Sequence, residues 1–312
     1  MIKEDILDPL KSKKLIGMDS YFDYLLNLHS SNSFPKVMLI SGKKGLGKFT
    51  LINHFLNYIF SKNLYNLKDK IIDEDSEVYK KQLNSVFYNI LHIKNEGSEK
   101  IKIEDIRSLK SILSKSTISK DPRFIILDDV EQLNTNSSNA LLKIIEEPSE
   151  KNYFILIDNK KKNVIETISS RCIKINIYIN KLNRSKIINS LIEQKNIKKI
   201  LKHENLDLSP GLFLRYNSLC LEHDILYNLD YLTKLEKLLR LYKKSKNKMF
   251  IDLSILFTDE YFYNLSLKEK KQILLFYSLK NKIIHYINDF FIYNLNLNSV
   301  LNLIQSQFNY AK

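Results

Sequence analysis

The stretch from Arg123 to Ile177 constrains the fold more than any other part of the chain. It contains two short, wholly apolar runs, Phe124–Leu127 and Tyr153–Ile157, which have the pattern of strands buried on both faces of a parallel sheet. Between them, apolar residues recur at helical spacing over Thr135–Glu146, and the proline that follows ends that helix. An alternating strand over Ile173–Ile177 closes the stretch. Strands that alternate with a helix in this way predict an α/β fold with a parallel sheet.

Polar side chains stand where the two apolar strands end. Asp128 and Asp129 follow the first strand, and Asp158 and Asn159 follow the second. In open α/β sheets ligands gather at the carboxyl ends of the strands, so this edge is where a metal–phosphate group would bind. The other interpretation of the acidic pair is a carboxylate that caps the following turn.

A glycine-rich loop follows an earlier apolar strand, Val37–Ile40, and leads into a run of helical spacing. Gly42, Gly45 and Gly47 let the backbone turn so that its N–H groups face a phosphate. The helix N-terminus adds its positive dipole end, and Lys48 supplies a point charge for the terminal phosphates. Strand, loop and helix start form the context of a phosphate-binding loop.

The loop departs from the phosphate-binding pattern at the position that should supply a magnesium ligand. That position calls for Ser or Thr, and the chain has Phe49. Thr50 comes one residue late, which on a helix is a rotation of about 100°. Two interpretations stay open: ATP binds without magnesium-dependent hydrolysis, or the loop is kept for its fold and binds no nucleotide.

Composition excludes several other classes of protein. The chain has only two cysteines, Cys172 and Cys220, and neither lies in a Cys-x-x-Cys pair, so no zinc site or other metal site is predicted. The acidic start and the lack of an apolar run of about 20 residues predict a cytoplasmic protein without a membrane segment. A formal net charge of +14 favours contact with a polyanion, although ordinary solvated surface would also account for it.

The pattern changes after Ile177. Helical periodicity takes over to the end of the chain, which places one boundary near residue 178 and a softer one near 222. The polar segment 61–81 is interpreted as a loop or a solvated helix, and Phe87–Ile93 as a strand.

Five short motifs, in this order, resemble the clamp-loader branch of the AAA+ ATPases. They are "LIG" at 15–17, "GKKGLGK" at 42–48, "IKIEDIRSLKSIL" at 101–113, "NALLKIIEEP" at 139–148 and "SRC" at 170–172. The resemblance covers roughly residues 15 to 215. It implies an AAA+ P-loop domain with a parallel sheet over 1–177, a small helical lid domain over 178–221, and an all-helical C-terminal collar domain over 222–312 that assembles a ring.

The resemblance also implies roles for individual residues. Asp128 matches the acid that orients magnesium, and Asp129 stands where an active ATPase carries Glu. Asn159, or its neighbour Asp158, matches the polar sensor. Arg171 matches the arginine finger, which reaches across a subunit interface to the terminal phosphate of a neighbour's ATP. An intramolecular salt bridge is the other interpretation of Arg171.

Three departures weaken the protein's own ATP site: Phe49, Asp129, and Leu212 where the family carries a second arginine sensor after Gly211. Arg171 is intact. This pattern is similar to that of the stator subunits of the bacterial DNA polymerase III clamp loader, which complete a neighbour's active site. The implied partners are the other subunits of a hetero-pentamer, the sliding clamp through the complex, and primed DNA.

Two alternatives stay open. A motor subunit of the same loader, with its own ATPase cycle, predicts Ser or Thr at position 49 and usually a zinc module. An unrelated P-loop enzyme such as a nucleotide kinase explains the glycine loop but leaves "EEP", "SRC" and the helical C-terminal third unexplained.

Overall fold

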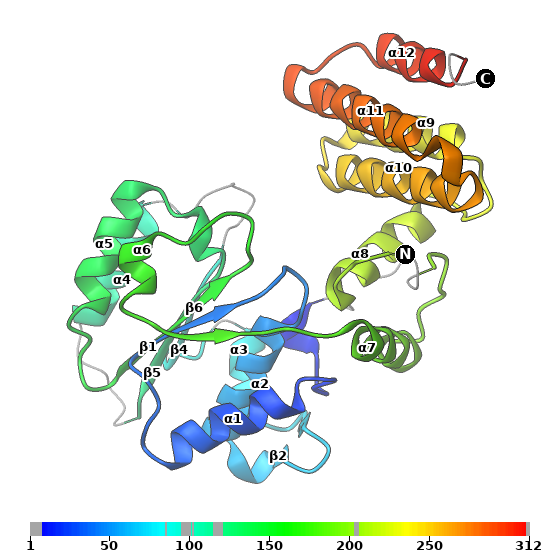
Figure 1. The fold of residues 1–312 in the computed structure, drawn as a ribbon. Coiled ribbons are helices and arrows are strands. Elements are labelled where there is room, and N and C mark those ends of the chain that lie inside the picture. Colours follow the sequence, from blue (N-terminus) through cyan, green and yellow to red (C-terminus); the bar gives the residue numbers. More distant parts are fainter. Residues whose placement is uncertain are drawn as a thin grey trace. The chain divides into compact units, whose positions relative to one another are not determined.

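The computed structural model describes residues 8–84, 86–94, 101, 103–114, 121–202 and 206–309. The acidic start of the chain and Lys102 of the third motif lie outside these residues. The chain divides into two compact units (Figure 1). Of the described residues, those between 8 and 196 and Ser209–Leu212 form the first, here called the sheet unit; those between 197 and 208 and between 213 and 309 form the second, the helical unit.

A five-stranded parallel sheet lies at the centre of the sheet unit, as the sequence predicts. Its strand order is β4-β5-β6-β1-β7. The strands are β1 (Val37–Ser41), β4 (Ile90–Ile93), β5 (Arg123–Leu127), β6 (Asn152–Asp158) and β7 (Ile173–Asn176). Because β1 pairs with β6, the glycine loop that follows β1 meets the polar residues that follow β6 at one edge of the sheet.

Helices cover both faces of this sheet (Figure 1). On one face α1 (Asp19–Ser30) and α2 (Lys48–Phe60) pack against alternate strand residues such as Ile126 and Ile155. On the other face α4 (Ile103–Ser114), α5 (Thr135–Ile145) and the short α6 (Glu166–Ser169) cover the intervening residues. All five residues of β5 are therefore buried, and burial on both faces explains the continuous apolar run Phe124–Leu127.

The segment 61–81 differs from its prediction as a loop or solvated helix. It forms the turn Lys62–Leu64, a two-stranded hairpin of β2 (Tyr65–Asn66) and β3 (Ile71–Ile72), and the start of α3 (Glu77–Leu83). This segment folds although it has few apolar residues, because the Tyr65 ring stacks on the ring of Phe22 in α1, with centroids 5.6 Å apart.

The C-terminal part is helical, as its periodicity predicts. Helix α7 (Lys181–Gln194) belongs to the sheet unit. The first residues of α8 (Pro210–Glu222), up to Leu212, also belong to the sheet unit, and the rest of α8 belongs to the helical unit. The boundaries near 178 and 222 stay predictions. The remaining helices are α9 (Tyr231–Ser245), α10 (Met249–Lys268), α11 (Ile273–Tyr293) and α12 (Leu297–Asn309), with short turns at Pro9–Lys11, Val130–Gln132 and Lys270–Gln272. Over the described residues, every helix is too short or too polar to span a bilayer.

Candidate functional site

The glycine loop connects β1 to α2 in the predicted strand–loop–helix arrangement. Gly45 and Gly47 have φ angles of +81° and +92°, a region that favours glycine. A Cβ atom on Gly42 would lie 2.8 Å from the carbonyl oxygen of Ile177. All three glycines are thus required by the path of the loop, whatever it binds.

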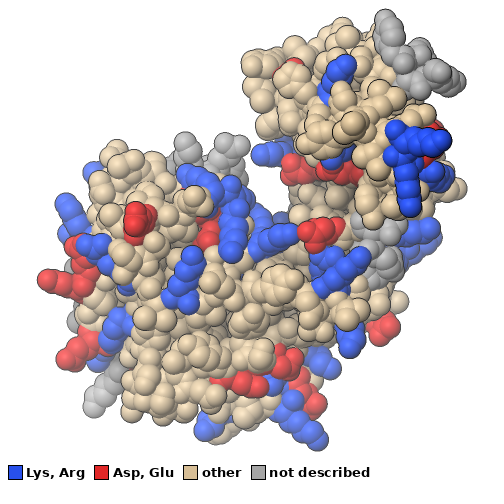
Figure 2. All heavy atoms as spheres, in the orientation of Figure 1, with Lys and Arg blue, Asp and Glu red and all other residues tan. Residues whose placement is uncertain are grey.

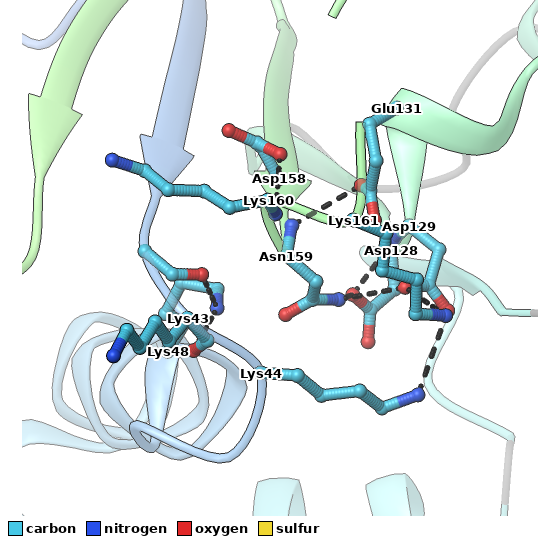
Figure 3. Close-up of polar contacts among 11 residues, drawn as sticks. Lys43, Lys44, Lys48, Asp128, Asp129, Glu131, Asp158, Asn159, Lys160 and Lys161 are labelled. Carbon is cyan, nitrogen blue, oxygen red and sulfur yellow. Dashed lines mark hydrogen bonds and ion pairs between the residues drawn. The ribbon is translucent and has the colours of Figure 1, made fainter. Parts of the chain in front are cut away.

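Lys48 is the first residue of α2, and only 3% of it is exposed. Its Nζ donates hydrogen bonds to the carbonyl oxygens of Gly42 (2.6 Å) and Lys43 (2.9 Å), as Figure 3 shows. Burial lowers the pKa of this ammonium to about 8, against the raising effect of nearby carboxylates, Asp128 foremost. The Lys48 ammonium, which would bind a phosphate, is thus bonded to carbonyl groups of the glycine loop.

Asp128 and Asp129 lie together after β5 and share one amide donor. Nδ2 of Asn159 is 2.9 Å from Oδ1 of each carboxylate (Figure 3). Oδ1 of Asp128 also accepts the backbone N–H of Asp129 at 2.8 Å, the turn-capping contact left open in the sequence. Asp129 adopts a left-handed φ of 55°, uncommon for a residue other than glycine.

Two lysines compensate the charge of Asp129. Nζ of Lys161 lies 3.3 Å from its Oδ1 and Nζ of Lys44 lies 4.0 Å from its Oδ2. Burial alone would raise the pKa of Asp129, but the Asn159 hydrogen bond and the two lysine charges outweigh burial, so this pKa lies below its ordinary value. Burial, followed by the charge of Asp129, instead raises the pKa of Asp128.

The structure distinguishes between the two sensor candidates. Asn159 faces the acidic pair, whereas Asp158 bonds to the neighbouring strand and to its own turn. Oδ2 of Asp158 accepts Ser41 Oγ at 2.5 Å, and Oδ1 accepts the backbone N–H of Lys160 at 2.8 Å. Of the two candidates, Asn159 is the one whose side chain faces the acidic pair, and its role as a sensor stays a prediction.

The sequence interpretation missed Glu131, which is only 3% exposed. Its Oε2 accepts the backbone N–H of Asn159 at 3.1 Å, and its Oε1 has no hydrogen-bond partner among the described residues. Burial raises the pKa of this carboxyl. The available signal was the spacing Asp-Asp-x-Glu, which a tight turn after β5 folds into one cluster.

An aromatic side chain takes the position of the missing magnesium ligand. The Phe49 ring stacks on the ring of His92 in β4, with centroids 4.1 Å apart and planes at 20°. Burial, with a smaller contribution from Lys94, lowers the pKa of His92 to about 4, so this imidazole is neutral near pH 7. Thr50 is half-buried one residue further along α2.

The start of α8 packs against the glycine loop within the sheet unit. Ser209 Oγ donates to the carbonyl of Lys44 at 2.5 Å, and the N–H of Gly211 donates to the carbonyl of Gly45 at 2.8 Å. Arg215, the next arginine along α8, is exposed and belongs to the helical unit. Nothing in the sequence linked Ser209 to a loop some 160 residues earlier.

Arg171 lies between α6 and β7, and its side chain is 41% exposed. Its Nη2 is 2.9 Å from Oε1 of Glu146, and its Nη1 donates to the carbonyl of Thr167 at 2.9 Å. The intramolecular salt bridge left open in the sequence is therefore present. The guanidinium nevertheless stays at the surface.

The residues at the sheet edge fit the phosphate part of a nucleotide better than its metal. Glycine loop, helix N-terminus and Lys48 match a phosphate site. Magnesium requires oxygen ligands in near-octahedral geometry, and Phe49 supplies none, while lysines already neutralise Asp129. Across the described ranges, no three His, Cys, Asp or Glu side chains are arranged to hold a metal ion. The residues present do not fit a magnesium-bound nucleotide.

Comparison with known proteins gives a family. A family model described as "DNA polymerase III, delta subunit" matches residues 17–181. Subunit delta' of DNA polymerase III from Buchnera aphidicola subsp. Schizaphis graminum is 31% identical over 153 residues, 47% of this chain and 44% of that one. Subunit delta' from Bacillus subtilis is 26% identical over 148 residues, with the same coverage of both chains.

Gamma subunits match as well. The DNA polymerase III subunit gamma of Buchnera aphidicola subsp. Acyrthosiphon pisum is 26% identical over 202 residues, 64% of this chain and 52% of that one. A crystal structure of a gamma subunit-related protein from Thermotoga maritima has a TM-score of 0.45 and 18% identity, over 91% of this chain and 99% of that one.

The chain spans about half the length of the curated relatives it matches. The family model covers more than half of the 312 residues, and the sheet, the glycine loop, the acidic turn and "SRC" all lie inside the match. The chain therefore belongs to the DNA polymerase III delta-subunit family.

Proposed function

We propose that this chain is the delta-prime subunit of a bacterial DNA polymerase III clamp loader and acts as its stator. It completes the ATP site of a neighbouring motor subunit with Arg171 while the sliding clamp is loaded on primed DNA in the cytoplasm. Its own site has no magnesium-dependent ATP hydrolysis. The observation that carries this proposal is the Phe49 ring, stacked on His92 where a magnesium ligand belongs, in a chain whose Arg171 stays at the surface.

The absence of hydrolysis follows from the chemistry of the site. An active ATPase uses a Ser or Thr hydroxyl on magnesium and a carboxylate that positions water. Phe49 cannot bind the metal, and the Asp129 carboxylate is engaged by Asn159 and Lys161. Nucleotide that enters this site binds through its phosphates to the loop, without the metal.

The exposed position of the Arg171 side chain suits a residue that acts on a neighbouring subunit. The guanidinium has five N–H donors, so its contacts with Glu146 and the Thr167 carbonyl leave donors that can bind an approaching phosphate. A guanidinium is always charged and binds phosphate in bidentate geometry, which a lysine does not reproduce. The partners proposed on this basis are the other loader subunits, and through them the clamp and primed DNA.

A second candidate is an ATP-hydrolysing motor subunit of the gamma type. The alignment with the Buchnera gamma subunit favours it, because that alignment covers 64% of the chain. Phe49 argues against it.

ATP turnover by a clamp loader reconstituted from its cognate subunits tests the proposal, with wild-type chain or Arg171→Ala, and with clamp and primed DNA present. We expect the isolated chain to be inactive. We expect Arg171→Ala to lower turnover, by about 10³-fold at the one site that the arginine serves. Gel filtration controls for assembly, and Arg171→Lys tests whether charge alone suffices. ATP hydrolysis by the purified chain, lost with Lys48→Ala, would instead establish the motor subunit.

A further inference from the structure

Two groups of its own chain fix the guanidinium of Arg171, and they come from different elements. The Thr167 carbonyl belongs to α6, just before the arginine, and accepts from Nη1 at 2.9 Å. Glu146 follows the last residue of α5, and its Oε1 lies 2.9 Å from Nη2. A guanidinium has five N–H donors, so these two contacts leave donors for a further acceptor.

The position of Glu146 does not serve the stability of its helix. A carboxylate at a helix C-terminus faces the negative end of the helix dipole, which is unfavourable, and Glu147 adds a second negative charge beside it. The ion pair with Arg171 is also exposed on both sides, at 41% and 45%, so it contributes little to the stability of the fold. Its main effect is geometric, because it fixes where the arginine side chain points.

We propose that Glu146 is a positioning residue for Arg171. It holds the guanidinium against the ends of α5 and α6, so that the remaining N–H donors are oriented before a neighbour's terminal phosphate arrives. This inference rests on the proposed function, in which Arg171 acts in trans. Orientation of a reacting group before the substrate binds lowers the barrier of the chemical step, and small misplacements are costly.

Glu146→Gln in the reconstituted loader tests this role, with Glu147→Gln as the matched control. Glu147 is the adjacent exposed carboxylate, and in the part of the chain that the structure describes it forms no hydrogen bond or ion pair. We expect Glu146→Gln to lower kcat for ATP about tenfold with KM unchanged. We expect Glu147→Gln to match wild type. Glu146→Ala should reproduce the loss, and assembly should be unchanged in every variant.

The double variant separates positioning from a general structural effect. Once Arg171 is alanine, Glu146→Gln should lower turnover no further, because the group it positions is gone. Wild-type turnover in Glu146→Gln, a rise in turnover, or an equal loss in the Arg171→Ala background would overturn the inference. If Arg171→Ala itself leaves turnover unchanged, the proposed function fails. If Arg171→Ala lowers turnover and Glu146→Gln does not, the inference about Glu146 fails alone.

Discussion

The buried side chain of Asn159 stabilises two neighbouring acidic side chains, Asp128 and Asp129, in the sheet unit. One amide group donates to two adjacent carboxylates that would otherwise repel each other, while Lys161 approaches the second of them. Hydrogen bonds to a charged carboxylate favour its ionised form. Asp129 therefore keeps its charge at low exposure, and Asp128 takes the raised pKa.

The buried side chain of His54 makes the stability of the fold depend on pH. It is fully buried in α2, where its Nε2 lies 2.9 Å from the Ser12 carbonyl oxygen and its Nδ1 lies 3.0 Å from the Tyr65 hydroxyl. Because a carbonyl only accepts, Nε2 carries the proton and Nδ1 accepts from the tyrosine. Burial lowers the pKa of His54 to about 4, well below the unfolded value near 6.5.

The sign of that shift predicts acid destabilisation. The unfolded chain binds a proton at His54 more readily than the folded chain does, so the free energy of unfolding is at its full value above pH 6.5. It falls by roughly 3 kcal/mol as the pH drops from 6.5 to about 4. Urea unfolding of wild type and His54→Gln at pH 7.5, 5.5 and 4 should show their stability difference narrowing as the pH falls. A pH-independent difference for His54→Gln would contradict the prediction.

At the scale of elements, the sequence predicts those parts whose pattern is local. The four apolar residues of β5 (Phe124–Leu127) and the helical stripe of α5 follow from periodicity, and the structure confirms both. The hairpin of β2 and β3 was not predicted, because Tyr65 depends on Phe22, more than 40 residues earlier. The packing of Ser209 on the glycine loop was unpredictable for the same reason: its partner is remote in sequence.

That packing makes Gly45 sensitive to substitution for two reasons. A Cβ atom there would meet Ser209 Oγ at 2.5 Å and the Leu212 backbone nitrogen at 2.8 Å, and its φ is +81°. Gly47 has the same kind of φ, +92°, but its Cβ would meet only Met18 Cε, at 3.6 Å. Gly47→Ala therefore measures backbone strain alone, and Gly45→Ala measures strain plus the clash with the start of α8.

We expect Gly47→Ala to lower the free energy of unfolding by about 1 kcal/mol and Gly45→Ala by about 3 kcal/mol. Chemical denaturation of the two variants beside wild type provides the measurement. Equal losses would show that the contact between the loop and α8 is not tight in solution.

For the whole molecule, the net charge of +14 is the property with the widest consequence. On the face shown in Figure 2, Lys and Arg side chains are spread over much of the surface with acidic side chains among them. A dispersed positive charge attracts a polyanion without selecting a sequence. The sequence predicts this attraction but not a DNA-contacting residue, because contact depends on which side chains share a surface.

The isolated chain should accordingly bind primed DNA weakly and non-specifically. We expect its affinity to fall at least tenfold between about 50 and 200 mM salt, because several phosphate contacts release counterions. Fluorescence anisotropy with labelled primer–template at both salt concentrations is the measurement. Affinity that persists at the higher salt would indicate a dedicated DNA site on this chain.

The stack of Phe49 on His92 also bears on the evolutionary reversibility of this site. Phe49→Ser would restore a hydroxyl at the metal position, but it would also remove a ring packed 4.1 Å from a neutral imidazole. The cavity left behind costs about 2–3 kcal/mol, since the surrounding side chains relax only partly. A mutation that returns the hydroxyl therefore lowers stability at once. Under the proposed function, the packing of Phe49 on His92 itself opposes the return of a metal ligand to this site.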